Sequence, residues 1–374
     1  ITNLDLTTQA AWDGLKNQQV PADACGADYA SPSLGSYTFD GGTASGSTDA
    51  QGDTTIGGLP VAAYLVCETS APSTVKTKAA PFLVTVPFPN NSTNAANGNG
   101  EWLYDVNVYP KNTVVLAPSK GVDVAANGLK TDSQVTFPVT ATVPSIASTD
   151  SFKHFVISDP LDANLTSGDV ASVKVDGQDV DSSYYSITPG QTVSLGFTKA
   201  GLAFLKTKPN ATVEVVFTAK VVSVPAGGVI ENTATLYVDT VPQGDPPDTP
   251  PLTPPSEPGT PTNKVATSWG DVKVNKTDAD NSKSLKGATF QVYNAKDPYA
   301  ASCDNAVKEG SAISVDGATE FTSDDDGVVS IAGLFVDKKK GAPNEDPVTP
   351  DHAQRCYVLV ETAAPAGYVL PANA

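Results

Sequence analysis

Three polar residues in the middle of the chain occupy positions that should face inward. In an extended strand, alternate side chains point to the same face. Each of the three shares its parity with the apolar residues around it, so all three should point into one core. They are Lys120 within 114–124, Asp159 within 155–161 and Asn232 within 230–236. Because burial of an unpaired charge is very costly, we expect the three groups to lie together or to be neutralised.

A lysine, a carboxyl group and an asparagine in an apolar core can react with one another. A desolvated lysine loses its proton and becomes a nucleophile, while a desolvated carboxyl keeps its proton. Protonated Asp159 would polarise the side-chain carbonyl of Asn232. Attack by Lys120 would then release ammonia and leave an amide between the two side chains. The alternatives are a buried ion pair, or a Lys120 side chain that extends outward to water.

A similar pair is predicted near the end of the chain. Lys276 has the parity of the two valines before it, and Glu361 has that of Tyr357 and Leu359. The matching asparagine is not evident. Asn373 lies only 12 residues beyond Glu361, so we expect the last strand to lie beyond the end of this sequence.

The stretch 102–112 reads WLYDVNVYPKN. Alternation predicts a strand in which Val106 and Val108 share one face and Lys111 lies on the other. Lys111 is therefore expected to be exposed, at a strand end that Pro110 makes rigid. An exposed lysine is ordinarily a solvated charge, so the pattern alone assigns Lys111 no role.

Few residues suit metal binding or acid–base catalysis. The two histidines, His154 and His352, leave little for a metal cage or a general base. The acidic turns 278–281 and 324–326 could hold calcium, but neither has the full EF-hand spacing, and such turns are more often only solvated. We expect no metal and no cofactor, and an enzyme is the weaker hypothesis.

Short alternating runs separated by Pro and Gly turns predict an all-β protein. Helix is expected only at 7–19 and 198–206. We expect three tandem Ig-like β-sandwiches in an elongated rod. The predicted strands are 82–88, 103–109, 135–143, 153–158, 172–175, 212–222, 229–238, 271–276, 288–293 and 357–362.

A length of 374 residues suggests two or three domains. We place them at 1–113, 114–265 and 266–374, and we expect both outer domains to be trimmed. The middle domain ends in 241–263, which contains nine prolines and is expected to be a semi-rigid linker or a surface crossing.

The first and third domains share two sequence matches. Residues 48–59 match 323–334 in register, and 64–69 match 357–362. Each first match is a turn signal, a short strand and a Gly-Leu end, so we expect a duplicated domain. Glu68 falls in the second match, but no partner lysine is visible ahead of it.

The formal net charge is −18. Such a surface repels phosphate backbones and anionic lipid, which disfavours nucleic-acid and membrane-surface binding. No apolar run reaches the 18 residues or so of a membrane span. The four cysteines, two in the first quarter and two in the last, lack zinc spacing and predict two local disulfides in a secreted protein.

Several of these stretches together resemble the sortase-assembled major pilins of Gram-positive bacteria, of the Actinomyces and Corynebacterium type. WLYDVNVYPKN resembles the pilin motif, W-x3-V-x-V-Y-P-K. YVLVETAAPAGY resembles the E-box, and YLVCETSAP is a shorter copy. LKGATFQVY and SDDDGVVSIAGL resemble a collagen-adhesin B-type domain. The middle domain resembles the pilin domain that carries a Lys–Asp–Asn isopeptide triad.

The resemblance implies a role for each motif. Lys111 would attack the thioester that a pilin-specific sortase forms on another subunit, and an amide would join it to that subunit's C-terminal threonine. Lys120, Asp159 and Asn232 would form one isopeptide triad, and Lys276 and Glu361 two thirds of another, with the carboxyl groups promoting each bond. The pilin motif comprises Trp102, Val106, Val108, Tyr109 and Pro110; the E-box comprises Tyr357, Glu361, Thr362, Pro365, Gly367 and Tyr368; the disulfides would be Cys25–Cys67 and Cys303–Cys356.

The leading hypothesis is therefore a structural shaft subunit of a cell-wall-anchored fimbria outside the cell. Its partners would be the sortase, identical subunits in a head-to-tail polymer, and minor or tip pilins. No LPxTG-like signal stands in the sequence, so anchoring is inferred from the resemblance. The alternatives are an adhesin module that binds a host or bacterial-surface ligand, and a secreted hydrolase.

Overall fold

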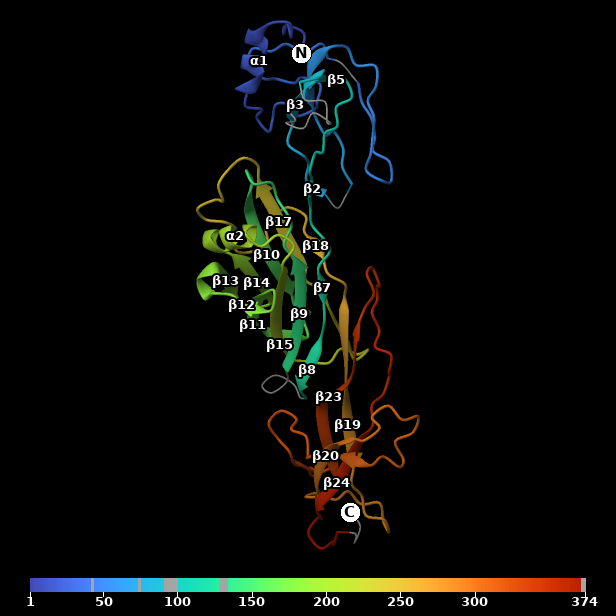
Figure 1. Cartoon of the computed structure of the whole chain (residues 1–374). Helices are drawn as coiled ribbons and strands as arrows, with labels where there is room; N and C mark the ends of the chain where they lie inside the picture. The colour runs from blue at the N-terminus through green and yellow to red at the C-terminus, as the bar shows by residue number, and fades with distance from the viewer. Residues whose placement is uncertain (42–43, 73–74, 91–99, 128–133, 371–374) are drawn as a thin grey trace. The chain divides into compact units, whose positions relative to one another are not determined.

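The structure is a computed structural model that describes all residues except 42–43, 73–74, 91–99, 128–133 and 371–374 (Figure 1). The chain divides into two compact units. The first comprises Ile1–Val114, Ser145–Ser151 and Thr240–Asp245, and the second comprises Val115–Pro144, Phe152–Asp239 and Pro246–Ala374. The second unit contains most of the predicted middle domain and all of the C-terminal one, so the three-domain division stays a prediction.

Among its described residues, the first unit contains one helix and short paired strands. Helix α1 (Gln9–Lys16) begins after Thr8, whose hydroxyl accepts a hydrogen bond from the Ala11 N–H, as expected of an N-cap. This confirms the predicted helix. The strand pairs are β1 (Ala62–Val66) with β3 (Phe82–Val86), β2 (Val75–Thr77) with β6 (Thr113–Val114), and β4 (Phe88–Pro89) with β5 (Trp102–Leu103).

The strand predicted over 103–109 is wrong. Beyond β5 the chain is irregular as far as Asn112. Val108 is 42% exposed and Tyr109 is 83% exposed, so neither face of this stretch is buried. Alternation alone does not make a strand, because a strand also needs a hydrogen-bonded neighbour, and β5 pairs with β4 over only two residues.

The second unit contains a β-sandwich of two antiparallel sheets, which bears out the expected fold class (Figure 1). Phe155, Phe197 and Phe217 are fully buried in it, and along β15 every second residue is buried, as its sequence predicts. Helix α2 (Lys199–Lys206) confirms the second predicted helix. One sheet has the order β13 (Tyr185–Thr188), β14 (Thr192–Phe197), β10 (Ser151–Pro160), β17 (Thr235–Val241), β18 (Thr260–Pro261); the other has β12 (Gln178–Asp179), β11 (Leu165–Val175), β15 (Thr212–Val221), β9 (Gln134–Thr142), β7 (Ser119–Lys120), with β8 (Asp123–Ala126) on β9.

Two further sheets form the C-terminal part of the second unit, around a core that includes Phe290, Val292 and Ile331. The predicted strand 229–238 is split, because its first half pairs with β19 and its second half with β18. One sheet has the order β16 (Val229–Asn232), β19 (Val265–Asn275), β23 (Val328–Lys340). The other has the order β21 (Lys308–Glu309), β20 (Thr289–Ala295), β22 (Phe321–Thr322), and β24 (Tyr357–Ala363) also pairs with β20.

The proline-rich segment 241–263 crosses a protein surface, the second of the two alternatives. It contributes β18 to a sheet. Earlier in the segment, the Leu252 backbone lies close to Gly196 of β14. A Cβ added to Gly196 would meet the Leu252 Cα at 2.5 Å. The segment is therefore packed and is not a free linker.

The two matched turns have the same hydrogen bonds. The Asp49 carboxylate accepts from the N–H groups of Gln51 and Asp53, and the Asp324 carboxylate accepts from those of Asp326 and Val328. Only the second turn leads into a strand, β23; the strand predicted after the first is wrong.

Candidate functional site

The three inward-facing residues of the middle domain meet inside the sandwich. Lys120 comes from edge strand β7 and is fully buried, Asp159 comes from β10 and is also fully buried, and Asn232 ends β16 at 4% exposure. Lys120 Nζ lies 2.5 Å from Asp159 Oδ2, and Asn232 Nδ2 lies 3.3 Å from that same oxygen. The carboxyl group thus lies between the amine and the amide.

The surroundings of this trio favour a neutral amine. Burial lowers the pKa of Lys120, while the Asp159 carboxylate opposes that shift. The Phe137 ring, whose centre lies 4.7 Å from Lys120 Nζ, also favours the charged form, so burial is the effect that favours the neutral amine. Asp159 Oδ1 and Asn232 Oδ1 are buried without a hydrogen-bond partner among the described residues.

The oxygen and nitrogen of the Asn232 amide occupy nearly the same volume, so the amide can take either of two orientations in this site. Rotating the amide by half a turn would bring Oδ1 toward Asp159 Oδ2. A proton on that carboxyl oxygen could then be donated to the amide carbonyl. The arrangement therefore contains a nucleophile, an acid and an electrophilic carbon, which are the groups that amide formation needs.

The predicted C-terminal pair is also brought together. Lys276 Nζ lies 2.8 Å from Glu361 Oε2, and the two side chains are 27% and 12% exposed. Glu361 Oε1 has no hydrogen-bond partner among the described residues. Asn373, the candidate third member, lies outside the described residues.

Lys111 is exposed, as predicted, although it is not on a strand. Its neighbour Asn112 is anchored: Asn112 Nδ2 donates to Glu68 Oε1 at 2.8 Å, and the Ala79 N–H donates to both side chains. Glu68 was predicted to lack a lysine partner, and the residue that it contacts is this asparagine. Sequence reasoning missed Asn112 because 44 residues separate it from Glu68.

The remaining motif residues have structural contacts. Trp102 is half exposed and packs against Trp12 in a tilted arrangement, with ring centres 5.3 Å apart. In the E-box, Tyr357 donates to the Phe335 carbonyl, and burial raises the pKa of Tyr357 to about 12. Thr362 donates to a β20 carbonyl, Pro365 is buried, Gly367 has a φ of +90°, and the Tyr368 hydroxyl donates to Asp278.

The acidic turns use their carboxylates within the protein. Asp278 accepts from the Asp280 N–H and from Tyr368, and Asp324 caps its own turn. Within the described part of the chain, no group of three or more His, Cys, Asp or Glu side chains is placed to hold a metal ion. The calcium hypothesis gains no support from these contacts.

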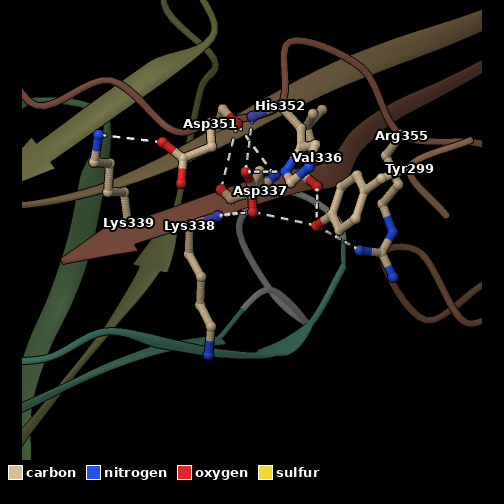
Figure 2. A network of polar contacts seen from close by, with 9 residues as sticks. Tyr299, Val336, Asp337, Lys338, Lys339, Asp351, His352 and Arg355 are labelled. Carbon is tan, nitrogen blue, oxygen red and sulfur yellow. Dashed lines mark hydrogen bonds and ion pairs between the residues drawn. The ribbon is translucent and has the colours of Figure 1, made fainter. Parts of the chain in front are cut away.

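A polar network fastens the loop before β24 to strand β23 (Figure 2). Asp337 accepts from the His352 N–H at 3.0 Å and lies 2.8 Å from His352 Nδ1. Tyr299 stacks on His352 and donates to Asp337, and Arg355 donates to the Tyr299 hydroxyl. Burial alone would raise the pKa of Asp337, but these donors lower it. The network is an anchor for the loop.

Both predicted disulfides are present. Cys25 is bonded to Cys67 and Cys303 to Cys356, and none of the described cysteines is free. The second bridge lies beside the anchored loop, one residue after Arg355.

Comparisons with known proteins agree with this arrangement. Residues 3–113 match the N-terminal D1 domain of Gram-positive pilin subunits, and residues 270–339 match a prealbumin-like fold domain. The fimbrial subunit type 2 of Actinomyces naeslundii is 40% identical over 387 residues, which cover 100% of this chain and 71% of that protein. The chain belongs to the fimbrial subunits of Gram-positive bacteria.

Solved structures support the assignment of this fimbrial subunit. The Actinomyces fimbrial adhesin FimA is 37% identical, with a TM-score of 0.58 over 68% of this chain and 92% of that one. The major pilin SpaD of Corynebacterium diphtheriae is 29% identical, with a TM-score of 0.60 over 84% of this chain and 69% of that one.

These relatives are structural proteins, and this fimbrial subunit is likewise a structural component of a surface pilus and not an enzyme. Fimbrial subunits polymerise with other pilin subunits. No helix in the described ranges is both long and apolar enough to cross a membrane.

Proposed function

We propose that this subunit forms the shaft of a covalent, cell-wall-anchored pilus and strengthens itself with an internal Lys120–Asn232 amide. The observation that carries the proposal is the fully buried Lys120 amine, held at 2.5 Å by Asp159, with the Asn232 amide on the same carboxyl oxygen. A buried pair of this kind is a weak source of stability by itself, so a chemical role is the better explanation.

The internal reaction needs only these three side chains. A proton moves from Lys120 Nζ to Asp159 Oδ2, which leaves a neutral amine and a carboxylic acid. The acid donates to the Asn232 carbonyl oxygen while Nζ attacks Cγ. The bond from Cγ to the amide nitrogen then breaks, ammonia leaves with the two protons it had and one from the lysine amine, and an Nζ–Cγ amide remains. Asp159 ends the reaction with the proton that it took from Lys120. The same chemistry at Lys276 and Glu361 would require Asn373 or a residue outside this sequence.

The link between subunits would form at Lys111. A pilin-specific sortase would hold the C-terminal threonine of another subunit as a thioester. Lys111 Nζ would attack that carbonyl carbon, the carbon–sulfur bond would break, and the sortase thiol would leave with the proton released from the amine. Exposure of Lys111 and the anchored side chain of the adjacent Asn112 support this role, because a preset nucleophile loses less freedom on reaction.

The internal bond is tested by the intact mass of the reduced chain. We expect a deficit of one ammonia, mapped by digestion to Lys120 linked with Asn232. Asp159→Asn should abolish the deficit, whereas Asp179→Asn, at an exposed site on the same sandwich, should not. A wild-type chain of full mass would overturn this part of the proposal. A deficit of two would show that Lys276 has also reacted.

The linkage is tested in cells that assemble the pilus. We expect Lys111→Arg to abolish the ladder of high-mass polymer while the monomer stays folded. Lys16→Arg, at an exposed position in the same unit, should leave the ladder intact. A normal ladder from Lys111→Arg would contradict the role of Lys111.

An adhesive role is the second candidate. It is supported by the relative described as a fimbrial adhesin, to which this chain is 37% identical. The ligand would lie on a host or bacterial surface. Binding of purified subunits to cells would test it. A variant of the second unit that fails to fold would serve as the negative control. Minor or tip pilins remain the alternative carriers of adhesion.

A further inference from the structure

Strand β7 lies at the edge of its sheet and carries Lys120. On one side it pairs with β9, where Lys120 lies opposite Val139. On the other side the Lys120 N–H donates to Asn263 Oδ1 at 2.8 Å, and Asn263 Nδ2 donates to the Lys120 carbonyl at 3.0 Å. One side-chain amide thus takes the place of a neighbouring strand and satisfies both backbone groups of the reacting lysine.

The same short segment also holds the other reactant. Two residues after Asn263, Val265 pairs with Asn232 in the register of β16 and β19. One residue before it, the Thr262 N–H donates to the Ala234 carbonyl at 2.9 Å. Residues 260–265 therefore contact the chain on both sides of the site, although Lys120 and Asn263 are 143 residues apart.

Lysine needs such a constraint more than most nucleophiles do. Its four-carbon side chain is flexible, and a displacement of about 1 Å can slow a positioned reaction by roughly a hundredfold. Asp159 fixes the amine end of Lys120. Asn263 fixes the backbone end, so the chain of atoms between the two is held at both ends.

We propose that Asn263 is a positioning residue for the internal amide bond, which forms only after residues 260–265 have docked between β7 and β16. This rests on the Lys120–Asn232 bond proposed above. Asn263 does not touch the reacting atoms; it acts through the backbone of Lys120.

The test follows ammonia loss over time. The full chain is kept in denaturant from the moment of synthesis, diluted into native buffer, quenched in acid at intervals and weighed by intact mass. We expect Asn263→Ala to lose ammonia at least about tenfold more slowly than wild type. Asn263→Asp keeps an acceptor for the Lys120 N–H but loses the donor, so an intermediate rate is expected.

The matched control is Asn127→Ala. Asn127 Oδ1 accepts from the Phe335 N–H at 2.9 Å, which is the same kind of bond in the same unit, away from the reactants. It should react at the wild-type rate. A rate for Asn263→Ala equal to that of wild type, or an equal slowing in Asn127→Ala, would overturn the proposal.

The pH profile separates positioning from loosening of the fold. A positioning defect lowers the rate at every pH and leaves the midpoint of the profile in place. Local opening would let water reach the Lys120–Asp159 pair and would shift the midpoints of the profile, which would overturn the proposal. If Asn263→Ala does not refold, the rate of Asn263→Asp decides: a wild-type rate overturns the proposal and a slower one supports it. A wild-type chain that never loses ammonia overturns the internal bond itself, and the role of Asn263 with it.

Discussion

At the scale of single residues, the anchor at Asn112 matters because the neighbouring Lys111 is exposed to solvent. A long exposed side chain has many rotamers, and motion of its backbone would add to the freedom lost on reaction. Asn112 is tied to Glu68, which shares the Ala79 N–H with it. Glu68 directly follows Cys67, so the anchor is continuous with a disulfide-bonded part of the first unit.

We therefore expect Asn112→Ala to slow amide formation at Lys111 by about tenfold, because the residue next to the lysine is no longer anchored. The loss of the two hydrogen bonds that the Asn112 side chain makes should cost only about 1–3 kcal/mol of stability. The measurement is the initial rate with a purified pilin sortase and a donor subunit. Asn107→Ala, at an exposed position in the same stretch, is the control. An unchanged rate for Asn112→Ala would refute the anchoring role.

At the scale of elements, the proline-rich segment behaves as part of the sandwich. Glu257 pairs with Lys153 of β10 at 2.9 Å, and Asp248 pairs with Lys199 of α2. These exposed pairs contribute little each. The close contact of Leu252 with Gly196 on β14 therefore provides the tighter constraint, since only glycine leaves room for it.

Gly196→Ala should push the segment away from β14. We expect a loss of about 1–3 kcal/mol in unfolding free energy, as for other overpacked sites, and faster proteolysis within 246–258. Urea denaturation and limited digestion would measure the two effects. Gly227→Ala is the matched control, because a Cβ there would meet nothing within 4 Å. Equal stability of the two variants would show that the segment is loosely held.

The segment also covers a titratable group. His154 is 1% exposed, and its Nε2 lies 3.8 Å from Glu257. Burial lowers the pKa of His154 from its usual 6.5, against the opposing effect of Asp239 and Glu257. The folded chain therefore resists a proton that the unfolded chain accepts.

The sign of the pH dependence follows. The free energy of unfolding carries no penalty from His154 above pH 6.5. As the pH falls below 6.5, neutral His154 lowers the free energy of unfolding by at most about 1.4 kcal/mol per pH unit. Urea midpoints at about pH 7.5 and about pH 5.5 would measure this, and His154→Gln should flatten the difference. The same slope in His154→Gln and wild type would assign the pH dependence to other groups.

Strands with a regular alternation could be predicted from the sequence. The inward orientation of Lys120, Asp159 and Asn232 could be predicted with them. Their parity fixes which face each side chain takes. The irregular stretch at 104–112 shows the limit: it alternates, but whether a partner strand lies beside it depends on distant residues. Asn263 and Asn112 could not be found in this way, because they lie outside regular strands and their partners are set by the tertiary fold.

At the scale of the whole molecule, covalent bridges close long loops in both units. Cys25–Cys67 spans 42 residues and Cys303–Cys356 spans 53. Closing a loop of this length removes conformations from the unfolded chain. The second bridge also stands beside the Asp337–His352 anchor, so the loop before β24 is held twice (Figure 2).

Replacing both Cys303 and Cys356 by serine should lower the unfolding free energy by about 2–4 kcal/mol. Urea denaturation of the oxidised wild type and of the double variant would measure the difference. The Asp337–His352 contacts should keep the folded loop in place, so the native far-UV circular dichroism should not change. A loss of native structure in the variant would show that the anchor cannot hold the loop alone.

The second disulfide has a further consequence when the protein is stretched. A subunit that is linked at Lys111 and at its C-terminal end carries tension only from Lys111 onward, so the Cys303–Cys356 bridge lies in the loaded part of the chain. A chain extends by about 3.3–3.6 Å per residue, so the 53 residues inside that bridge represent about 180 Å of contour length. While the bridge is intact, that length cannot be drawn out, however far the surrounding strands separate. Reduction would release it. The redox state of its surroundings therefore sets how far a strained subunit can lengthen before its backbone is taut.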